Sequence, residues 1–146
     1  MQGARLQYVA PKLSLFVSGG LQGASKNLDT YEKLSLGGPK AVRAYATGEV
    51  LVDDGWLATA ELRYAVRPEA TVFVFCDAAH GRYWHDPRPF DVETGRSLRG
   101  YGVGFNWSKP GKVTMNLSVA WRGTGAGLSD GGDRNPRVYW SIQKAF

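Results

Sequence analysis

Gly55-Trp-Leu-Ala-Thr-Ala-Glu-Leu-Arg-Tyr64 carries the clearest structural signal in this sequence of 146 residues. Its apolar residues occupy every second position from Trp56 to Tyr64, and polar residues stand between them at Thr59, Glu61 and Arg63. Successive side chains of a β-strand point to opposite faces, so strict alternation is typical of a strand with one apolar and one polar face. We therefore predict a strand here.

The same period of two recurs along most of the chain, and helical spacing fits none of the segments concerned. The other alternating segments are Leu13–Gln22, Tyr101–Trp107, Val113–Arg122 and Val138–Phe146. We therefore predict an all-β fold, an antiparallel up-and-down β-meander.

The connections between these segments alternate between short and long. The short ones are rich in proline and glycine and cover about 10–12, 67–70 and 109–112, whereas the long ones cover about 23–55, 80–96 and 123–136. In an antiparallel meander this order places all tight turns at one end, as in outer-membrane β-barrels. A soluble small β-barrel that binds a ligand is the alternative, because any antiparallel sheet with one buried face also alternates.

Composition and charge restrict the function classes. No apolar run approaches the roughly 20 residues of a transmembrane helix, although a membrane strand needs only about 9–11 alternating residues. The net charge is +5, but basic and acidic residues are interleaved, so we expect no nucleic-acid partner. No apolar segment follows Arg5, so the sequence shows no signal peptide. We expect either a cytoplasmic protein or part of a longer precursor.

Several segments, in order, resemble the barrel of the haemolysin activation/secretion proteins, the outer-membrane transporters of two-partner secretion. Val42-Arg-Ala-Tyr45 is similar to the loop motif Val-Arg-Gly-Tyr of that family, and Phe75-Cys-Asp-Ala-Ala79 is similar to its strand motif Phe-x-Asp-x-Gly. The other similar segments are Ala24–Asp29, Tyr31–Pro39, Gly55–Leu57, Glu61–Tyr64, Gly102–Trp107 and Tyr139–Phe146. Ala44 and Ala79 depart from glycines of the family, and alanine would carry a cost there if a positive φ or a close backbone approach were needed.

The resemblance implies that residues 1–146 are one C-terminal barrel segment, with six full strands and a partial strand at 6–9. The long connection of about 23–55 would fold into the lumen, and Arg43 of its motif would pair with Asp77 beside Phe75 on the barrel wall. Gly37 and Gly38 would let this loop turn. Val42 and Ala44 are the neighbours of Arg43 in the loop motif. Pro39 and Tyr45 would pack its tip.

The resemblance also implies partners and a location. The expected partners are an unfolded secreted protein in transit, the lipid of a Gram-negative outer membrane, and the barrel-assembly machinery. Trp140, Ile142 and Phe146 would form the C-terminal sorting signal that this machinery reads. No cofactor and no metal are implied.

The residues themselves also favour a pair between Arg43 and Asp77. Asp77 shares a strand face with Phe73 and Phe75, opposite an apolar face, and a carboxylate there needs a cation. A guanidinium offers a fixed two-donor fork. In the alternative, Arg43 is a solvated charge and Asp77 pairs with Arg63 or Arg82. Likewise, Glu61 and Arg63 either line the lumen or form an ordinary exposed pair.

No catalytic constellation is apparent, and we expect a non-enzymatic protein. His80 and His85 match no metal-ligand spacing, and Cys76 has no setting that would activate a thiol. The turn-rich segment Ser129–Asp133 lacks the regular acidic spacing of a calcium loop.

Overall fold

The computed structural model describes residues 1–90, 94–124 and 135–144. The strands within these ranges are β1 (Gln2–Ala10), β2 (Leu13–Gln22), β3 (Leu34–Ser35), β4 (Leu51–Val52), β5 (Asp54–Arg67), β6 (Ala70–Arg82), β7 (Gly95–Lys109), β8 (Val113–Thr124) and β9 (Arg137–Lys144). These residues include no helix of the length and apolarity that crossing a membrane requires.

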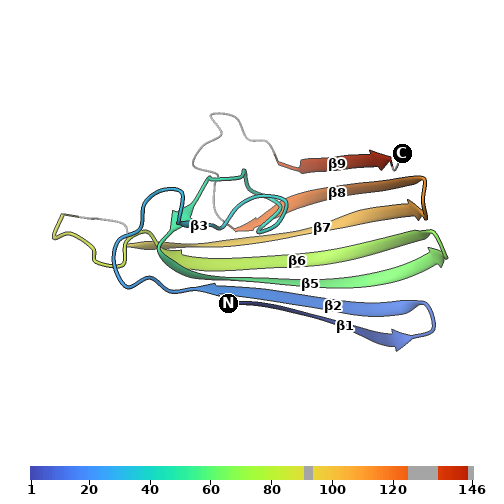
Figure 1. Ribbon diagram of the computed structural model, residues 1–146, viewed down its shortest axis with the longest axis horizontal. Helices are drawn as coiled ribbons and strands as arrows, with labels where there is room; N and C mark the ends of the chain where they lie inside the picture. Colours follow the sequence, from blue (N-terminus) through green and yellow to red (C-terminus); the bar gives the residue numbers. More distant parts are fainter. Residues whose placement is uncertain (91–93, 125–134, 145–146) are drawn as a thin grey trace.

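The principal element is a seven-stranded antiparallel sheet with strand order β1-β2-β5-β6-β7-β8-β9 (Figure 1). Each strand pairs with the next one in the main sheet, so the predicted all-β antiparallel meander is confirmed. The sheet is open, with β1 and β9 at its edges. The strand expected at 6–9 extends over Gln2–Ala10, because pairing with β2 orders residues whose own pattern is weak.

The short and long connections lie at opposite ends of the sheet (Figure 1). Residues 11–12, 68–69 and 110–112 form the tight turns, and Gly111 takes a left-handed φ of 69° in the last of them. The longest connection, from β2 to β5, contains β3 and β4, which pair as a small separate sheet. This connection supplies the segment that covers part of the main sheet.

The two faces of the sheet differ in chemistry. One face is apolar and exposed: Val74 is 53% exposed, Val103 47% and Trp140 73%. Other exposed side chains on this apolar face are Leu15, Val17, Trp56, Leu62, Tyr64, Val72, Tyr101, Phe105, Leu117, Val138 and Ile142. The opposite, polar face carries mostly small or hydrogen-bonding side chains. The buried core lies on the polar face, where the long connection packs.

Candidate functional site

The segment of residues 36–50, here called the inner loop, has a fixed shape of its own. Its ends are joined by a hydrogen bond from Leu36 N to Val50 O (2.9 Å), and Val42 N donates to Leu36 O (3.0 Å). Gly38 has a φ of 121°, which strongly favours glycine, and a Cβ at Gly37 would overlap the carbonyl oxygen of Ala46. The two adjacent glycines therefore make this tight fold possible.

The inner loop contributes five of the eleven buried hydrophobic residues of the described core. Leu36, Val42, Tyr45 and Val50 are each at most 1% exposed. Together with Val52 they form one cluster with side chains of the sheet, namely Phe73, Phe75, Ala79, Leu98 and Ala120. Full burial of a large apolar side chain is worth about 1.5–3 kcal/mol, so this packing holds the loop firmly on the sheet.

Arg43 attaches the inner loop to the main sheet through Asp77 of β6. Its Nε donates to Asp77 Oδ2 (2.9 Å) and its Nη2 to Asp77 Oδ1 (2.8 Å), which makes a two-pronged pair. The backbone N–H of Arg43 also donates to Asp77 Oδ2 (3.1 Å), and the Thr59 hydroxyl donates to Asp77 Oδ1 (2.9 Å). The Asp77 side chain is 1% exposed and that of Arg43 10%. The alternative pairing of Asp77 with Arg63 or Arg82 is not found.

Glu61 of β5 is a third member of this group, and sequence reasoning did not identify it as a partner of the loop. Arg43 Nη1 donates to Glu61 Oε1 (2.8 Å), while Arg63 donates to Glu61 Oε2 through Nε (2.8 Å) and Nη2 (2.6 Å). Two guanidinium groups therefore offset two carboxylates. We call Arg43, Glu61, Arg63 and Asp77 the charge cluster. Such mutual compensation is what keeps buried charges tolerable.

The surroundings keep Arg43 charged. Burial alone would lower its pKa, but the hydrogen bonds and attraction of Asp77 and Glu61 outweigh that effect and raise the pKa above its ordinary value. The guanidinium is thus a fixed positive charge in the loop.

Arg43 also lies flat on an aromatic ring. Its Cζ is 3.4 Å from the centre of the Phe75 ring, an arrangement that adds a cation–π attraction. Phe75 in turn lies across Gly102 of β7, its direct strand partner, where any Cβ would overlap the ring. Phe73 lies across Gly104 in the same way. The β7 glycines thus make room for the two rings beneath the loop, a role that alternation alone did not reveal.

Ala44 and Ala79 fit without backbone strain. No described residue other than glycine has a positive φ, so neither Ala44 nor Ala79 is forced into a conformation that disfavours a side chain. The methyl group of Ala44 faces Gly100 of β7, where a Cβ would lie 2.9 Å from Ala44 Cβ. The condition of a positive φ is therefore not met at Ala44 or Ala79, and the space for the Ala44 methyl group comes from Gly100.

A second attachment point holds the root of the connection, and sequence reasoning missed it. Lys33 Nζ pairs with Asp53 Oδ1 (2.8 Å), donates to Tyr83 O (2.7 Å) and lies 3.9 Å from the centre of the Trp84 ring. The backbone N–H of His85 donates to Asp53 Oδ2 (3.0 Å). We call Lys33, Asp53, Tyr83, Trp84 and His85 the root clasp.

The root clasp controls the ionisation of Asp53. Burial of this carboxyl would raise its pKa, but the hydrogen bonds from Lys33 and from the His85 N–H outweigh burial and hold the pKa below its ordinary value. His85 contacts Asp54 Oδ2 through Nδ1 (2.9 Å). The described residues contain no group of side chains that could hold a metal ion.

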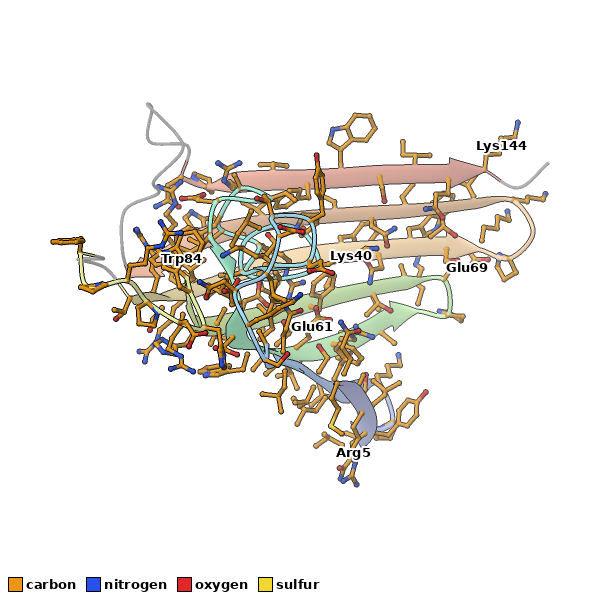
Figure 2. All side chains as sticks on the ribbon, turned by 60° about the vertical axis from the view of Figure 1, so that its left-hand side comes forward. Arg5, Lys40, Glu61, Glu69, Trp84 and Lys144 are labelled. Carbon is orange, nitrogen blue, oxygen red and sulfur yellow. The ribbon has the colours of Figure 1, made fainter. Side chains whose placement is uncertain are left out.

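The remaining candidate residues do not belong to the charge cluster. Pro39 is exposed at the tip of the inner loop, over the polar face; Figure 2 shows its neighbour Lys40 over the sheet. Trp140 and Ile142 are exposed on the apolar face of β9. Phe146 lies outside the described residues, as do Asp91 and Ser129–Asp133. Cys76 is exposed on the apolar face.

Comparison with known proteins gives one kind of relative. Over 105 residues the chain is 29% identical to the heme/hemopexin transporter protein HuxB of Haemophilus influenzae strain 86-028NP, and equally to that of strain ATCC 51907 / DSM 11121 / KW20 / Rd. The match covers 68% of this chain and 19% of the relative, so the chain spans about a fifth of these proteins. No family model and no solved structure matches it.

Removing one carboxylate of the charge cluster should loosen the inner loop. In Asp77→Asn the buried Arg43 loses its main partner, and breaking a buried pair costs about 3–5 kcal/mol. Glu61→Gln should cost less, because Asp77 still binds both the guanidinium and the Arg43 N–H. Urea unfolding followed by tryptophan fluorescence in detergent measures both effects. Glu69→Gln in an exposed turn is the control, and equal losses in all three variants would contradict the assignment.

The fit between Ala44 and Gly100 gives a reciprocal test. Gly100→Ala should displace the inner loop, at a cost of about 1–3 kcal/mol for overpacking, and make the bond after Arg43 accessible to trypsin. Adding Ala44→Gly should restore protection.

Gly3→Ala, where a Cβ would meet nothing within 4 Å, serves as the control for a strand glycine. If the double variant were cleaved as fast as Gly100→Ala alone, the contact between these two positions would not be what positions the loop.

The root clasp should weaken in acid. Because the folded pKa of Asp53 is depressed, its contribution to stability is present above the unfolded value of about 3.9 and disappears as the pH falls through the folded pKa. The unfolding free energy, measured between neutral pH and strong acid, should therefore fall less steeply below about pH 4 in Asp53→Asn than in the parent chain. Identical pH profiles in Asp53→Asn and the parent chain would show that Asp53 does not contribute to the loss of stability in acid.

Proposed function

We propose that this chain forms part of the pore wall of an outer-membrane transporter that exports an unfolded partner protein, and that the inner loop lies in the lumen. It acts without bond-making chemistry. The single observation that carries this proposal is the pairing of Arg43 with Asp77 and Glu61, which fixes a long loop onto the polar face of a sheet whose other face is apolar and exposed.

The two faces support a barrel wall in lipid. In a membrane barrel the apolar side chains face the acyl chains and the polar ones face the lumen, an alternation that this sheet repeats over its strands. A soluble barrel would instead bury Val74, Val103 and Leu117 inside, and here all three are exposed. The tight turns at one end and long connections at the other also match the arrangement of such barrels.

The relatives support transport as the activity. HuxB carries the name of a heme/hemopexin transporter, and the similarity spans most of this chain. From it we infer an outer-membrane location in a Gram-negative bacterium, a secreted protein as the cargo, and delivery by the barrel-assembly machinery. Trp140 and Ile142, exposed on the last described strand, are the residues we assign to recognition by that machinery.

The membrane role can be tested with a matched pair of lysines. Val74→Lys places a charge on the apolar face, where Lys near the bilayer midplane costs about 2–4 kcal/mol, whereas Asn116→Lys places the same charge on the polar face. We expect phosphatidylcholine vesicles to carry the parent chain and Asn116→Lys on flotation, and to carry much less of Val74→Lys.

Circular dichroism of the floated fraction checks that the bound chain is β-structured. The parent chain could instead stay a monodisperse, folded monomer in plain buffer and not bind the vesicles. That result would replace this proposal with the alternative of a soluble small β-barrel that binds a ligand.

A further inference from the structure

The inner loop covers only part of the polar face. Its contacts reach Asp77, Leu98 and Ala120, which lie toward the long connections. Figure 2 shows the half of the sheet near Glu69 and Lys144, at the tight turns, free of the loop. The charge cluster does not explain this uncovered half of the polar face.

The uncovered half is lined by neutral hydrogen-bonding side chains. Strand register aligns Thr71, Asn106, Asn116 and Ser141 in one row across β6 to β9. A second row, Ser108, Thr114 and Gln143, lies beside it toward the turns. We call these residues, with Ser118, the neutral floor. None of its side chains carries a charge.

A cavity of about 420 Å³ on the polar face lies between the tip of the inner loop and the neutral floor. Pro39, Arg43 and Arg63 form its wall on the loop side, and Asn106, Asn116 and Ser141 form its wall on the floor side. The charges on the loop side are already engaged, because Arg43 binds Asp77 and Arg63 binds Glu61. The floor therefore presents the uncommitted hydrogen-bonding groups.

Much of the hydrogen-bonding capacity of the neutral floor is not used by contacts within the described residues. Asn116 Nδ2 donates to Ser141 Oγ (3.1 Å), and Ser108 Oγ contacts Thr114 Oγ1 (3.1 Å). Within the described residues the Asn106 carboxamide has no protein partner. A carboxamide offers two donors and an acceptor, the same kinds of group as a peptide unit.

The spacing of the floor matches an extended polypeptide. Side chains on one face of a strand repeat every second residue, about 6.8 Å at 3.4 Å per residue, and an extended peptide repeats its own backbone groups over the same distance. A chain lying parallel to β7 and β8 would thus meet Asn106 and Ser108 on one strand, and Thr114, Asn116 and Ser118 on the other, in constant register.

We propose that the neutral floor binds the backbone of an extended polypeptide, without selecting its side chains. The inference rests on the proposed function, since the polypeptide would be the cargo. A surface without charges neither traps nor repels charged side chains, and a single neutral hydrogen bond contributes little net free energy of binding. Contact with the cargo is therefore weak and repetitive, as passage requires.

Photocrosslinking in vesicles or detergent micelles tests this floor. A benzophenone amino acid replaces either Thr114, on the floor, or Met115, its neighbour on the apolar face. The probe is a biotinylated peptide of glycine, serine, threonine and alanine, which is too polar to fold. We expect several-fold more adduct from position 114 than from 115, and a marked loss when Asn106→Ala and Asn116→Ala are added.

Two competitors identify what is recognised. The same peptide with N-methylated backbone amides should label poorly, and neutral maltooligosaccharides should not displace the parent peptide. Equal adducts from both positions, equal labelling by the methylated peptide, or displacement by the sugar would each overturn the inference. Circular dichroism confirms that each variant is folded.

The outcome is separable from the proposed function. If the chain floats with vesicles but position 114 shows no preference, the neutral floor is wrong and the membrane role stands. If flotation fails while position 114 is labelled in micelles, the floor stands and the membrane role falls.

Discussion

The compensation of the buried Arg43 charge is the constraint on which the rest of this structure depends. An uncompensated guanidinium on the sheet would be strongly destabilising, so the place of the loop depends on Asp77 and Glu61 as well as on its apolar packing. Those two carboxylates come from adjacent strands, and the Phe75 ring that supports the guanidinium needs the space left by Gly102. Strand register, glycine placement and loop shape thus together position the groups that compensate the charge of Arg43.

The fold was largely predictable from local pattern. Alternation in Gly55–Tyr64 and Val113–Arg122 directly indicates strands with one apolar and one polar face. The turn residues indicate where each strand ends. β1 was only partly predicted, because Gln2–Arg5 becomes a strand through its pairing with β2 rather than through a pattern of its own. The face on which the core would lie was not determined by pattern, since alternation is the same whether the apolar side is buried or exposed.

The site was predictable only where resemblance supplied a long-range link. The pair of Arg43 and Asp77 was expected, but the role of Glu61 depends on its cross-strand pairing with Phe75, which no local pattern contains. The fit of Ala44 against Gly100 and the clasp between Lys33 and Asp53 join residues far apart in sequence, and each depends on loop shape as well as register.

The root clasp also sets how far the inner loop can travel. Lys33 and Asp53 are joined at 2.8 Å, and Arg43 stands ten residues from each of them. Ten fully extended residues reach at most about 33–36 Å. The tip of the inner loop can therefore lie no farther from the root clasp than this distance, which is close to the hydrocarbon thickness of a bilayer, about 30 Å. A freed tip could move over a distance of this order, but not far beyond it.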